Sequence, residues 1–327
     1  MKTRKLVVLL GPTATGKSSL AIDLALRFHG EIISADSVQV YRGLDIGTAK
    51  PSKEERQQVL HHLIDILDPD QEYSAAAFRA QADEIISRLH LRQIPIFVTG
   101  GTGLYLKALT RGLFRGPDRD SQLRAALYRR SEKEGSEVLH NELSRLDPEA
   151  ASRIHPHDLF RIIRALEVCT LSPKPISYFQ REHKFQDSPY EVLKIGFCCE
   201  RGELYRRIDS RAEKMLEMGW VEEVQSLLDR GYSSKLKSMQ SLGYKRILSH
   251  LFGEIELAQA LELIKRDTRR YAKRQITWFK KDPEIYWFPI DQNRGPEIEG
   301  LVMEFFNHCG KNAIPVKIGN LTPPPSL

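Results

Sequence analysis

The chain has 327 residues, of which 41% are hydrophobic and 28% charged, enough for one large domain or two moderate ones. Its formal net charge of +6 is compatible with a polyanionic partner but does not establish one. No apolar run approaches about 20 residues and no cleavable leader fits before the first strand, which predicts a cytoplasmic protein without a membrane span. The four cysteines form no C-x-x-C pair, which argues against a zinc site or disulfide framework and predicts buried free thiols at Cys169, Cys198, Cys199 and Cys309.

A phosphate-binding motif lies near the start of the chain. Gly11-Pro12-Thr13-Ala14-Thr15-Gly16-Lys17-Ser18 follows an apolar run at residues 6–10 and precedes a helical pattern at residues 19–26. In this context backbone N–H groups and the helix N-terminus bind an anion, Lys17 adds a positive charge, and the Ser18 hydroxyl can bind Mg²⁺. The motif predicts a di- or triphosphate site formed by Gly11, Thr13, Ala14, Thr15, Gly16, Lys17 and Ser18, but it does not identify the molecule that carries the phosphates.

Strand and helix patterns alternate through the first third of the chain. Residues 31–36 and 95–99 are predicted strands, and residues 74–91 have helical spacing with Ser74 as N-cap. This alternation predicts an α/β fold of the P-loop NTPase type, a parallel sheet flanked by helices. Ligands collect at the C-terminal ends of parallel strands, so the phosphate loop, Asp36 and Thr102 are expected to converge at one site.

From residue 118 to about residue 188 the pattern is helical without a strand signal, and strand patterns return at residues 192–199 and 286–290. We therefore predict a discontinuous catalytic core at residues 1–117 and 192–315, with an all-helical insertion at residues 118–191. Asp147 and Pro148 are expected to start a helix inside that insertion. The proline-rich residues 316–327 are expected to form a disordered tail.

Asp36 follows a predicted strand end beside the phosphate loop, and three roles are open to it. Its carboxylate can act as a general base, bind Mg²⁺, or cap a turn. The strand at residues 95–99 ends without the carboxylate that a motor-type ATPase usually has there. Thr102 follows that strand and can offer its hydroxyl to a substrate or a leaving phosphate, cap the next helix, or do both.

Basic residues gather in two helical stretches. Arg206, Arg207 and Arg211 share one predicted helix and can either clamp a departing diphosphate or form a solvated face. Residues 265–281 interleave lysines and arginines with aromatic side chains, as in nucleic-acid-binding helices, although a charge run also suits a solvated helix. His155 and His157 form only a weak metal-binding pattern, and His61-His62, before an expected apolar strand, is interpreted as structural.

Several motifs together resemble the bacterial tRNA dimethylallyltransferases, also called tRNA isopentenyltransferases of the IPP transferase family. Beyond the phosphate loop they include Asp36-Ser37-Val38-Gln39-Val40-Tyr41, Ile46-Gly47-Thr48-Ala49-Lys50-Pro51, His61-His62-Leu63-Ile64-Asp65, residues 100–105, Arg161-Ile162-Ile163-Arg164-Ala165-Leu166-Glu167, and Ala272-Lys273-Arg274-Gln275-Ile276-Thr277-Trp278-Phe279. They span residues 6 to about 290 in the family's order. The set is specific, although the phosphate loop alone is not.

The resemblance implies transfer of a dimethylallyl group from dimethylallyl diphosphate to the exocyclic 6-amino group of an adenosine beside the tRNA anticodon, at tRNA position 37. Asp36 would take the proton, while the phosphate loop, Lys17, Mg²⁺ on Ser18 and Arg211 would stabilise the leaving diphosphate. Thr102 would supply a hydroxyl. The target base would have to leave the stacked anticodon loop.

The resemblance also implies contacts with the tRNA anticodon stem-loop. They would come from Asp36, Ser37, Val38, Gln39, Thr102, Arg124, Phe160, Arg161, Ile162, Ile163, Arg164, Gln240, Ser241, Leu242, Gly243, Tyr244, Lys245, Lys273, Arg274, Gln275, Ile276, Thr277, Trp278, Phe279 and Lys280. In the family the helical insertion closes over the RNA. The zinc finger of eukaryotic relatives has no counterpart in this sequence, and we expect a monomer.

Three alternative functions remain compatible with parts of the sequence. Transfer to free AMP, ADP or ATP, as in adenylate isopentenyltransferases, would leave the insertion and the basic helix without a role. A small-molecule kinase would use the phosphate loop and Asp36 but nothing from Phe160 onward. A non-catalytic RNA-binding protein would leave the phosphate loop unexplained.

Overall fold

The computed structural model describes residues 4–114, 116–184, 187, 189–290 and 294–308. The chain separates into two compact units, residues 1–110 with 189–327, and residues 111–188. The helical insertion expected at residues 118–191 overlaps the second unit. The proline-rich tail and Cys309 lie outside the described residues.

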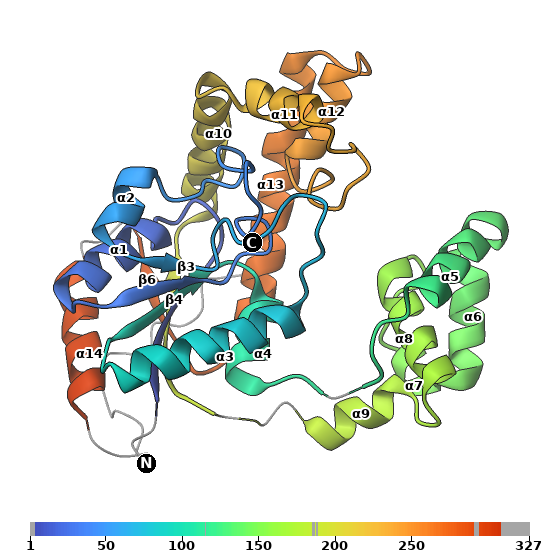
Figure 1. Cartoon of the computed structure of the whole chain (residues 1–327), viewed down its shortest axis with the longest axis horizontal. Helices are drawn as coiled ribbons and strands as arrows, with labels where there is room; N and C mark the ends of the chain where they lie inside the picture. Colours follow the sequence, from blue (N-terminus) through green and yellow to red (C-terminus); the bar gives the residue numbers. More distant parts are fainter. Residues whose placement is uncertain (1–3, 115, 185–186, 188, 291–293, 309–327) are drawn as a thin grey trace. The chain divides into compact units, whose positions relative to one another are not determined.

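The first unit is built on a parallel sheet of six strands in the order β3-β2-β4-β1-β5-β6. Figure 1 shows this sheet with helices packed around it. The central strand β1 pairs with β4 and β5, so that Val8 lies opposite Val98 and Lys194. The strands are β1 (Lys5–Leu10), β2 (Glu31–Ser34), β3 (His61–His62), β4 (Ile96–Gly100), β5 (Glu191–Cys198) and β6 (Ile285–Pro289). The predicted α/β class is confirmed.

Alternate residues of β1 serve the two faces of the sheet. Leu6 and Val8 pack toward α3 (Ala75–Leu91) and α4 (Gly103–Arg111), whereas Val7 and Leu9 pack toward α1 (Lys17–Arg27) and α14 (Gly295–Asn307). Successive side chains of a strand point to opposite faces, so a strand buried on both sides reads as one continuous apolar run. The Ser74 hydroxyl caps α3 by accepting a hydrogen bond from the Ala77 N–H, as predicted.

Helices beyond β5 complete the first unit. They are α10 (Arg201–Glu217), α11 (Trp220–Asp229), α12 (Tyr244–Leu251) and the long α13 (Leu257–Phe279), and α2 (Lys53–Gln58) lies earlier in the chain. Apolar residues join α10 to α13, namely Leu204, Ile208, Ala272 and Ile276. This packing fixes α13 beside the start of α10.

The apolar strand expected after His61-His62 does not form. The two histidines are themselves the edge strand β3, and Leu63 and Asp65 have positive φ angles of 63° and 55°. Left-handed backbone cannot continue a strand, so the chain turns away from the sheet directly after His62.

The second unit is all-helical over its described residues, as the sequence pattern predicts. It contains α5 (Ser121–Glu134), α6 (Ser136–Leu146), α7 (Pro148–Ala151), α8 (Leu159–Leu171) and α9 (Ile176–His183) around an apolar core. Asp147 caps α7 with Pro148 at its start. The core is centred on α8, whose Ile162, Ala165 and Val168 are fully buried.

The cysteines inside the described residues form no disulfide. Cys169, Cys198 and Cys199 are partly exposed rather than buried. None of the described helices is both long and apolar enough to span a bilayer.

Candidate active site

The phosphate loop leaves β1 and enters α1 through a backbone that only small residues fit. A side chain at Gly11 would place its Cβ 2.9 Å from the Phe197 carbonyl oxygen, and Gly16 adopts a φ of 77° at the N-cap of α1. The loop is closed by the Thr15 hydroxyl, which donates to the Pro12 carbonyl at 2.9 Å. The Lys17 ammonium donates to the same carbonyl at 3.2 Å. The loop therefore has the shape of an anion cradle.

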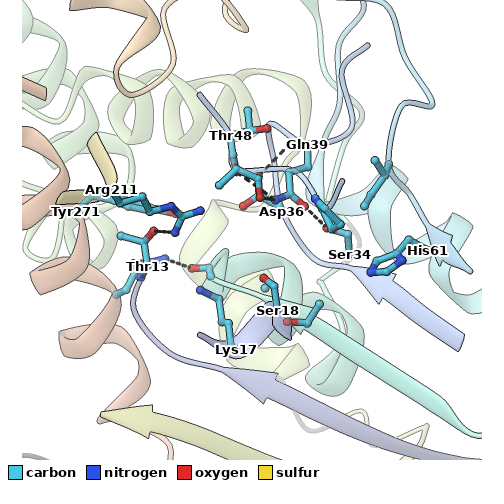
Figure 2. A pocket seen from close by; sticks show the side chains of 17 residues that line it. Thr13, Lys17, Ser18, Ser34, Asp36, Gln39, Thr48, His61, Arg211 and Tyr271 are labelled. Atoms are coloured by element: carbon cyan, nitrogen blue, oxygen red, sulfur yellow. Dashed lines mark hydrogen bonds between the residues drawn. The ribbon is translucent and has the colours of Figure 1, made fainter. Parts of the chain in front are cut away.

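One pocket lies at the C-terminal ends of the parallel strands, against the phosphate loop (Figure 2). Its lining comes from the loop, the ends of β2 and β4, the chain at residues 39–64, and helices α10 and α13. The lining residues are Thr13, Lys17, Ser18, Ser34, Asp36, Gln39, Thr48, Ala49, Pro51, His61, Ile64, Thr99, Gly100, Gly101, Arg211, Tyr271 and Gln275. The loop and Asp36 share this cavity, whereas Thr102 follows Gly101 and is not among the lining residues.

Asp36 combines a local structural contact with a position in the pocket. Its Oδ1 accepts hydrogen bonds from the backbone N–H groups of Val38 at 2.8 Å and Gln39 at 3.2 Å. Within the described residues, Oδ2 accepts no hydrogen bond. One carboxylate oxygen thus caps the turn, which leaves the second for a ligand or a proton.

Gln39 connects the end of β2 to the loop at residues 48–49, and both segments line the pocket. Its side-chain Oε1 accepts from the Ser34 hydroxyl at 3.0 Å, and its Nε2 donates to the carbonyls of Thr48 at 3.2 Å and Ala49 at 3.3 Å. The loop before Thr48 is held from α11, where the Glu223 carboxylate accepts from the backbone N–H groups of residues 45–47. The side-chain amide of Gln39 is therefore occupied by the protein itself.

Two cations share the pocket with Asp36. Burial and, to a smaller extent, the nearby Arg211 guanidinium lower the pKa of Lys17 to about 8, against the attraction of Asp36. Burial also lowers the pKa of Arg211, again against the attraction of Asp36. Arg211 Nη1 donates to Thr13 Oγ1 at 3.3 Å (Figure 2). The pocket thus contains two positively charged side chains before any ligand binds, and an incoming anion would neutralise them.

The other two arginines of α10 do not line the pocket. Arg206 and Arg207 both pair with Glu203, at 2.8 Å and 2.6 Å, and their side chains are exposed. Of the three arginines that the sequence offered as a clamp, only Arg211 lines the pocket.

Helix α13 brings two polar side chains to the pocket, the buried Gln275 and the partly buried Tyr271. Gln275 accepts a hydrogen bond from the Thr13 N–H and donates one to the Gly101 carbonyl. Burial raises the pKa of Tyr271 to about 12, and Asp36 adds to this effect while Thr102 opposes it. Tyr271 therefore stays a neutral phenol at physiological pH.

Thr102 lies at the start of α4. Its carbonyl accepts from the N–H groups of Tyr105 and Leu106, which starts the helix. Its Oγ1 is buried and makes no well-formed hydrogen bond within the described part of the chain. A buried hydroxyl in this state costs free energy unless a ligand pairs with it.

The exposed face of α13 carries the basic-aromatic pattern. Lys273, Arg274 and Thr277 are exposed, and the Trp278 side chain is 40% exposed. Gln275, Ile276 and Phe279 of the same stretch are buried, at 5%, 4% and 4% exposure. The Ile276 and Phe279 side chains pack inside the first unit, away from the exposed face of α13, whereas Gln275 lines the pocket.

The basic loop before α12 is divided in the same way. Gln240, Leu242 and Lys245 are exposed. Tyr244 is buried, with its hydroxyl donating to Glu223 at 2.6 Å, and a Cβ at Gly243 would clash with the Trp220 ring at 2.1 Å. Ser241 Oγ is buried without a hydrogen-bond partner among the described residues.

The candidate RNA-binding residues of the helical unit also differ in exposure. Phe160 is 58% exposed and Arg161 is exposed beside Asp158, whereas Ile162 and Ile163 are 0% and 1% exposed. The buried pair packs in the core of the unit, so their side chains are not available to a ligand.

Arg124 and Arg164 both bind the carboxylate of Glu167, which is fully buried. Arg124 Nε and Nη2 donate to it at 2.8 Å and 2.7 Å, Arg164 Nη1 donates from α8, and the Asp120 N–H adds another bond at 2.9 Å. Burial alone would raise the pKa of Glu167, but these hydrogen bonds outweigh it and lower the pKa to about 2. The two guanidinium groups thus hold the helical unit together.

His61 and Tyr271 are two of the pocket-lining side chains that sequence reasoning did not assign to the site. His61 comes from the edge strand β3, and its Nδ1 lies 2.8 Å from the Val59 carbonyl oxygen. Tyr271 is four residues before Gln275 on α13, so helical spacing would have placed both on one face. No comparable local signal points to His61.

No group of three or more His, Cys, Asp or Glu residues within the described ranges is arranged to hold a metal ion. His155 and His157 are locally bonded instead, since His155 Nδ1 accepts from the His157 N–H at 3.2 Å. A magnesium ion bound through substrate phosphates needs few protein ligands, and the Ser18 hydroxyl and Asp36 carboxylate line one pocket.

Comparison with known proteins agrees with this geometry. The chain matches the IPP transferase family over residues 39–282 and the isopentenyl transferase family over residues 4–67. It is 53% identical to a tRNA dimethylallyltransferase of Geotalea uraniireducens, covering 92% of this chain and 97% of that protein. It is 50% identical to a tRNA dimethylallyltransferase of Geobacter sulfurreducens, with the same coverage.

Solved structures show the same relationship. A full-length tRNA isopentenylpyrophosphate transferase of Bacillus halodurans is 41% identical with a TM-score of 0.69, over 92% of this chain and 96% of that one. A eukaryotic dimethylallyltransferase acting on tRNA is 29% identical with a TM-score of 0.80, over 93% of this chain and 80% of that one. With its phosphate loop, Asp36 and Arg211 around one cavity, the chain belongs to the tRNA dimethylallyltransferase family.

Proposed function

We propose that this tRNA dimethylallyltransferase moves the dimethylallyl group of dimethylallyl diphosphate to the 6-amino group of the adenosine that follows the anticodon, at tRNA position 37. The products are isopentenyladenosine in tRNA and free diphosphate. The observation that carries the proposal is a single pocket that holds both an anion cradle and a carboxylate, at Lys17 and Asp36. The cradle suits the leaving group and the carboxylate suits the proton of the amine.

The diphosphate end of the reaction falls to the phosphate loop. The bond between the allylic carbon and the diphosphate oxygen breaks, the allylic carbon carries the developing positive charge, and the oxygen takes the electron pair. Loop N–H groups and the partly buried Lys17 and Arg211 would face this growing negative charge. Because both cations are held in an unfavourable buried state beforehand, an anion gains more from them than it would at an exposed surface.

The acceptor end falls to Asp36. The adenine 6-amino group is a poor nucleophile because its lone pair is delocalised into the ring. As the new C–N bond forms, the nitrogen loses a proton, which Asp36 Oδ2 accepts while Oδ1 stays bonded to the Val38 and Gln39 N–H groups. The Thr102 hydroxyl, buried without a well-formed hydrogen bond among the described residues, would gain a partner in the substrate.

Magnesium fits the donor set of this pocket. The Ser18 hydroxyl would hold the ion, and Asp36 is a second oxygen ligand within the same cavity. A bound magnesium ion would add further positive charge to neutralise the leaving group.

Binding of the tRNA anticodon stem-loop is proposed for exposed residues of the assigned segments. On the first unit these include Lys273, Arg274, Thr277 and Trp278, whose cations suit phosphates and whose indole suits an unstacked base. On the helical unit they include Phe160 and Arg161, in line with the proposed clamping role of the insertion. The target adenosine would leave the loop stack to reach Asp36. We propose that the enzyme acts as a monomer in the cytoplasm, where its tRNA substrate is found.

The test offers the purified protein Mg²⁺, unmodified tRNA, and either dimethylallyl diphosphate or ATP, followed by mass analysis of the tRNA nucleosides. Prenylated adenosine should form only with the allylic donor and should be lost in Asp36→Ala. Prenylation of free AMP without prenylation of tRNA, or phosphate transfer from ATP, would overturn the proposal. A Lys17→Ala variant that retained full activity would contradict the assigned role of the phosphate loop.

A further inference from the structure

Gln275 uses both ends of its side-chain amide inside the first unit. Its Oε1 accepts a hydrogen bond from the Thr13 backbone N–H at 2.9 Å, and its Nε2 donates to the Gly101 backbone carbonyl at 3.0 Å. The side chain is 5% exposed. One residue of α13 thus connects the phosphate loop after β1 with the turn after β4.

The side-chain amide of Gln275 packs closely against the backbone at Gly101. A Cβ at Gly101 would lie 2.1 Å from Gln275 Nε2, so the amide occupies the volume that a side chain at residue 101 would need. The Thr13 side chain is held separately, by the Arg211 guanidinium at 3.3 Å. Two helices, α10 and α13, therefore fix the same residue of the phosphate loop.

We propose that Gln275 is a positioning residue for the diphosphate cradle and not a contact for tRNA. This inference rests on the proposed diphosphate site. The Thr13 N–H is already committed to Gln275, so the loop is held in one conformation before any anion arrives. When the loop is already ordered in the free protein, ordering it costs less free energy on binding, and the anion binds more tightly.

The exposed neighbours of Gln275 provide the contrast. Lys273 lies two residues earlier on the same helix and is exposed. If α13 serves tRNA through its exposed face and the cradle through its buried face, substitutions at the two positions affect different substrates. Removing Gln275 should impair diphosphate binding, whereas removing Lys273 should impair tRNA binding.

The test uses Gln275→Met, which keeps the length of the side chain and removes both hydrogen bonds, with Lys273→Ala as the matched control. Binding of inorganic diphosphate with Mg²⁺, in the absence of tRNA, is measured by titration calorimetry. We expect Gln275→Met to weaken binding about tenfold, the scale of two lost hydrogen bonds, and to raise the KM for dimethylallyl diphosphate while the KM for tRNA is unchanged. Lys273→Ala should leave diphosphate binding and the KM for dimethylallyl diphosphate unchanged and should raise the KM for tRNA.

Hydrogen–deuterium exchange separates a local effect from general unfolding. Exchange should become faster in the peptide containing residues 11–18 of Gln275→Met and stay unchanged in β5. Faster exchange throughout the first unit would refute a positioning role. If wild-type protein binds no diphosphate, the proposed function fails; if it does and Gln275→Met binds equally well with a raised tRNA KM, only this inference is overturned.

Discussion

The charge of Lys17 makes donor binding dependent on pH. Burial, and then the Arg211 guanidinium, lower its pKa to about 8, so the free enzyme loses this cation as the pH rises through that value. With a pKa of about 8, about nine tenths of the ammonium groups are charged at pH 7 and about one tenth at pH 9. If only the charged form binds the diphosphate well, affinity falls about tenfold between these two pH values.

The assay is calorimetric titration of the protein with dimethylallyl diphosphate and Mg²⁺ at pH 7, 8 and 9, without tRNA. Lys17→Arg is the control, because a guanidinium stays charged over this range while the ligand and the other groups titrate as before. The tenfold loss should be present in the wild type and absent in Lys17→Arg. Equal slopes in the two proteins would refute the assignment of the pH dependence to Lys17.

Three further outcomes follow from the structure. Asp36→Asn keeps an acceptor for the Val38 N–H, so it should lower kcat at least about 10²-fold with donor binding retained; a mild effect in single-turnover assays would exclude Asp36 as the base. Glu167→Gln weakens the buried pairing of two arginines and should lower the free energy of unfolding of the helical unit by about 3–5 kcal/mol, seen as faster hydrogen exchange in α8; unchanged exchange would argue against it. Trp278→Ala should raise the tRNA KM about 5- to 100-fold, the range for one stacked base, and leave the donor KM unchanged; the reverse would place the indole at the donor.

The parts of the site that the sequence predicted are those formed by consecutive residues. The conformation of residues 11–18 follows from their own sequence. Gly11 lies where a side chain would clash, and Gly16 has a positive φ angle that glycine adopts readily. The position of Asp36 after β2 also follows from local reading, because parallel strands deliver their C-terminal ends to the same edge.

The role of Arg211 could not be predicted from local sequence alone. Spacing placed Arg207 and Arg211 on one face of α10 and did not show which of them contacts the pocket. The structure separates them because Glu203 pairs with Arg207 one turn away and Arg211 continues into the pocket. The Glu203–Arg207 pair at i, i+4 is a signal that the sequence contains, and weighing it would have favoured Arg211.

His61 and Glu167 depend on long-range packing and could not be assigned from the sequence. His61 reaches the pocket because β3 pairs at the outer edge of β2, which is a property of the strand order. Glu167 was visible only as part of a family motif. Its partner Arg124 lies in α5, so the assignment of Arg124 and Arg164 as RNA contacts did not anticipate that both guanidinium groups bind one buried carboxylate.

The pocket differs from a hydrolytic phosphate site at the end of β4. A carboxylate after this strand would orient a water molecule for attack on the phosphate. In this chain β4 ends in Gly100, followed by Gly101, whose carbonyl is bonded to the Gln275 amide of α13. The carboxylate stands instead after β2, at Asp36, facing the cavity that the cations share. The turn after β4 thus packs against an amide of α13 and carries no carboxylate at Gly100 or Gly101 that could orient a water molecule.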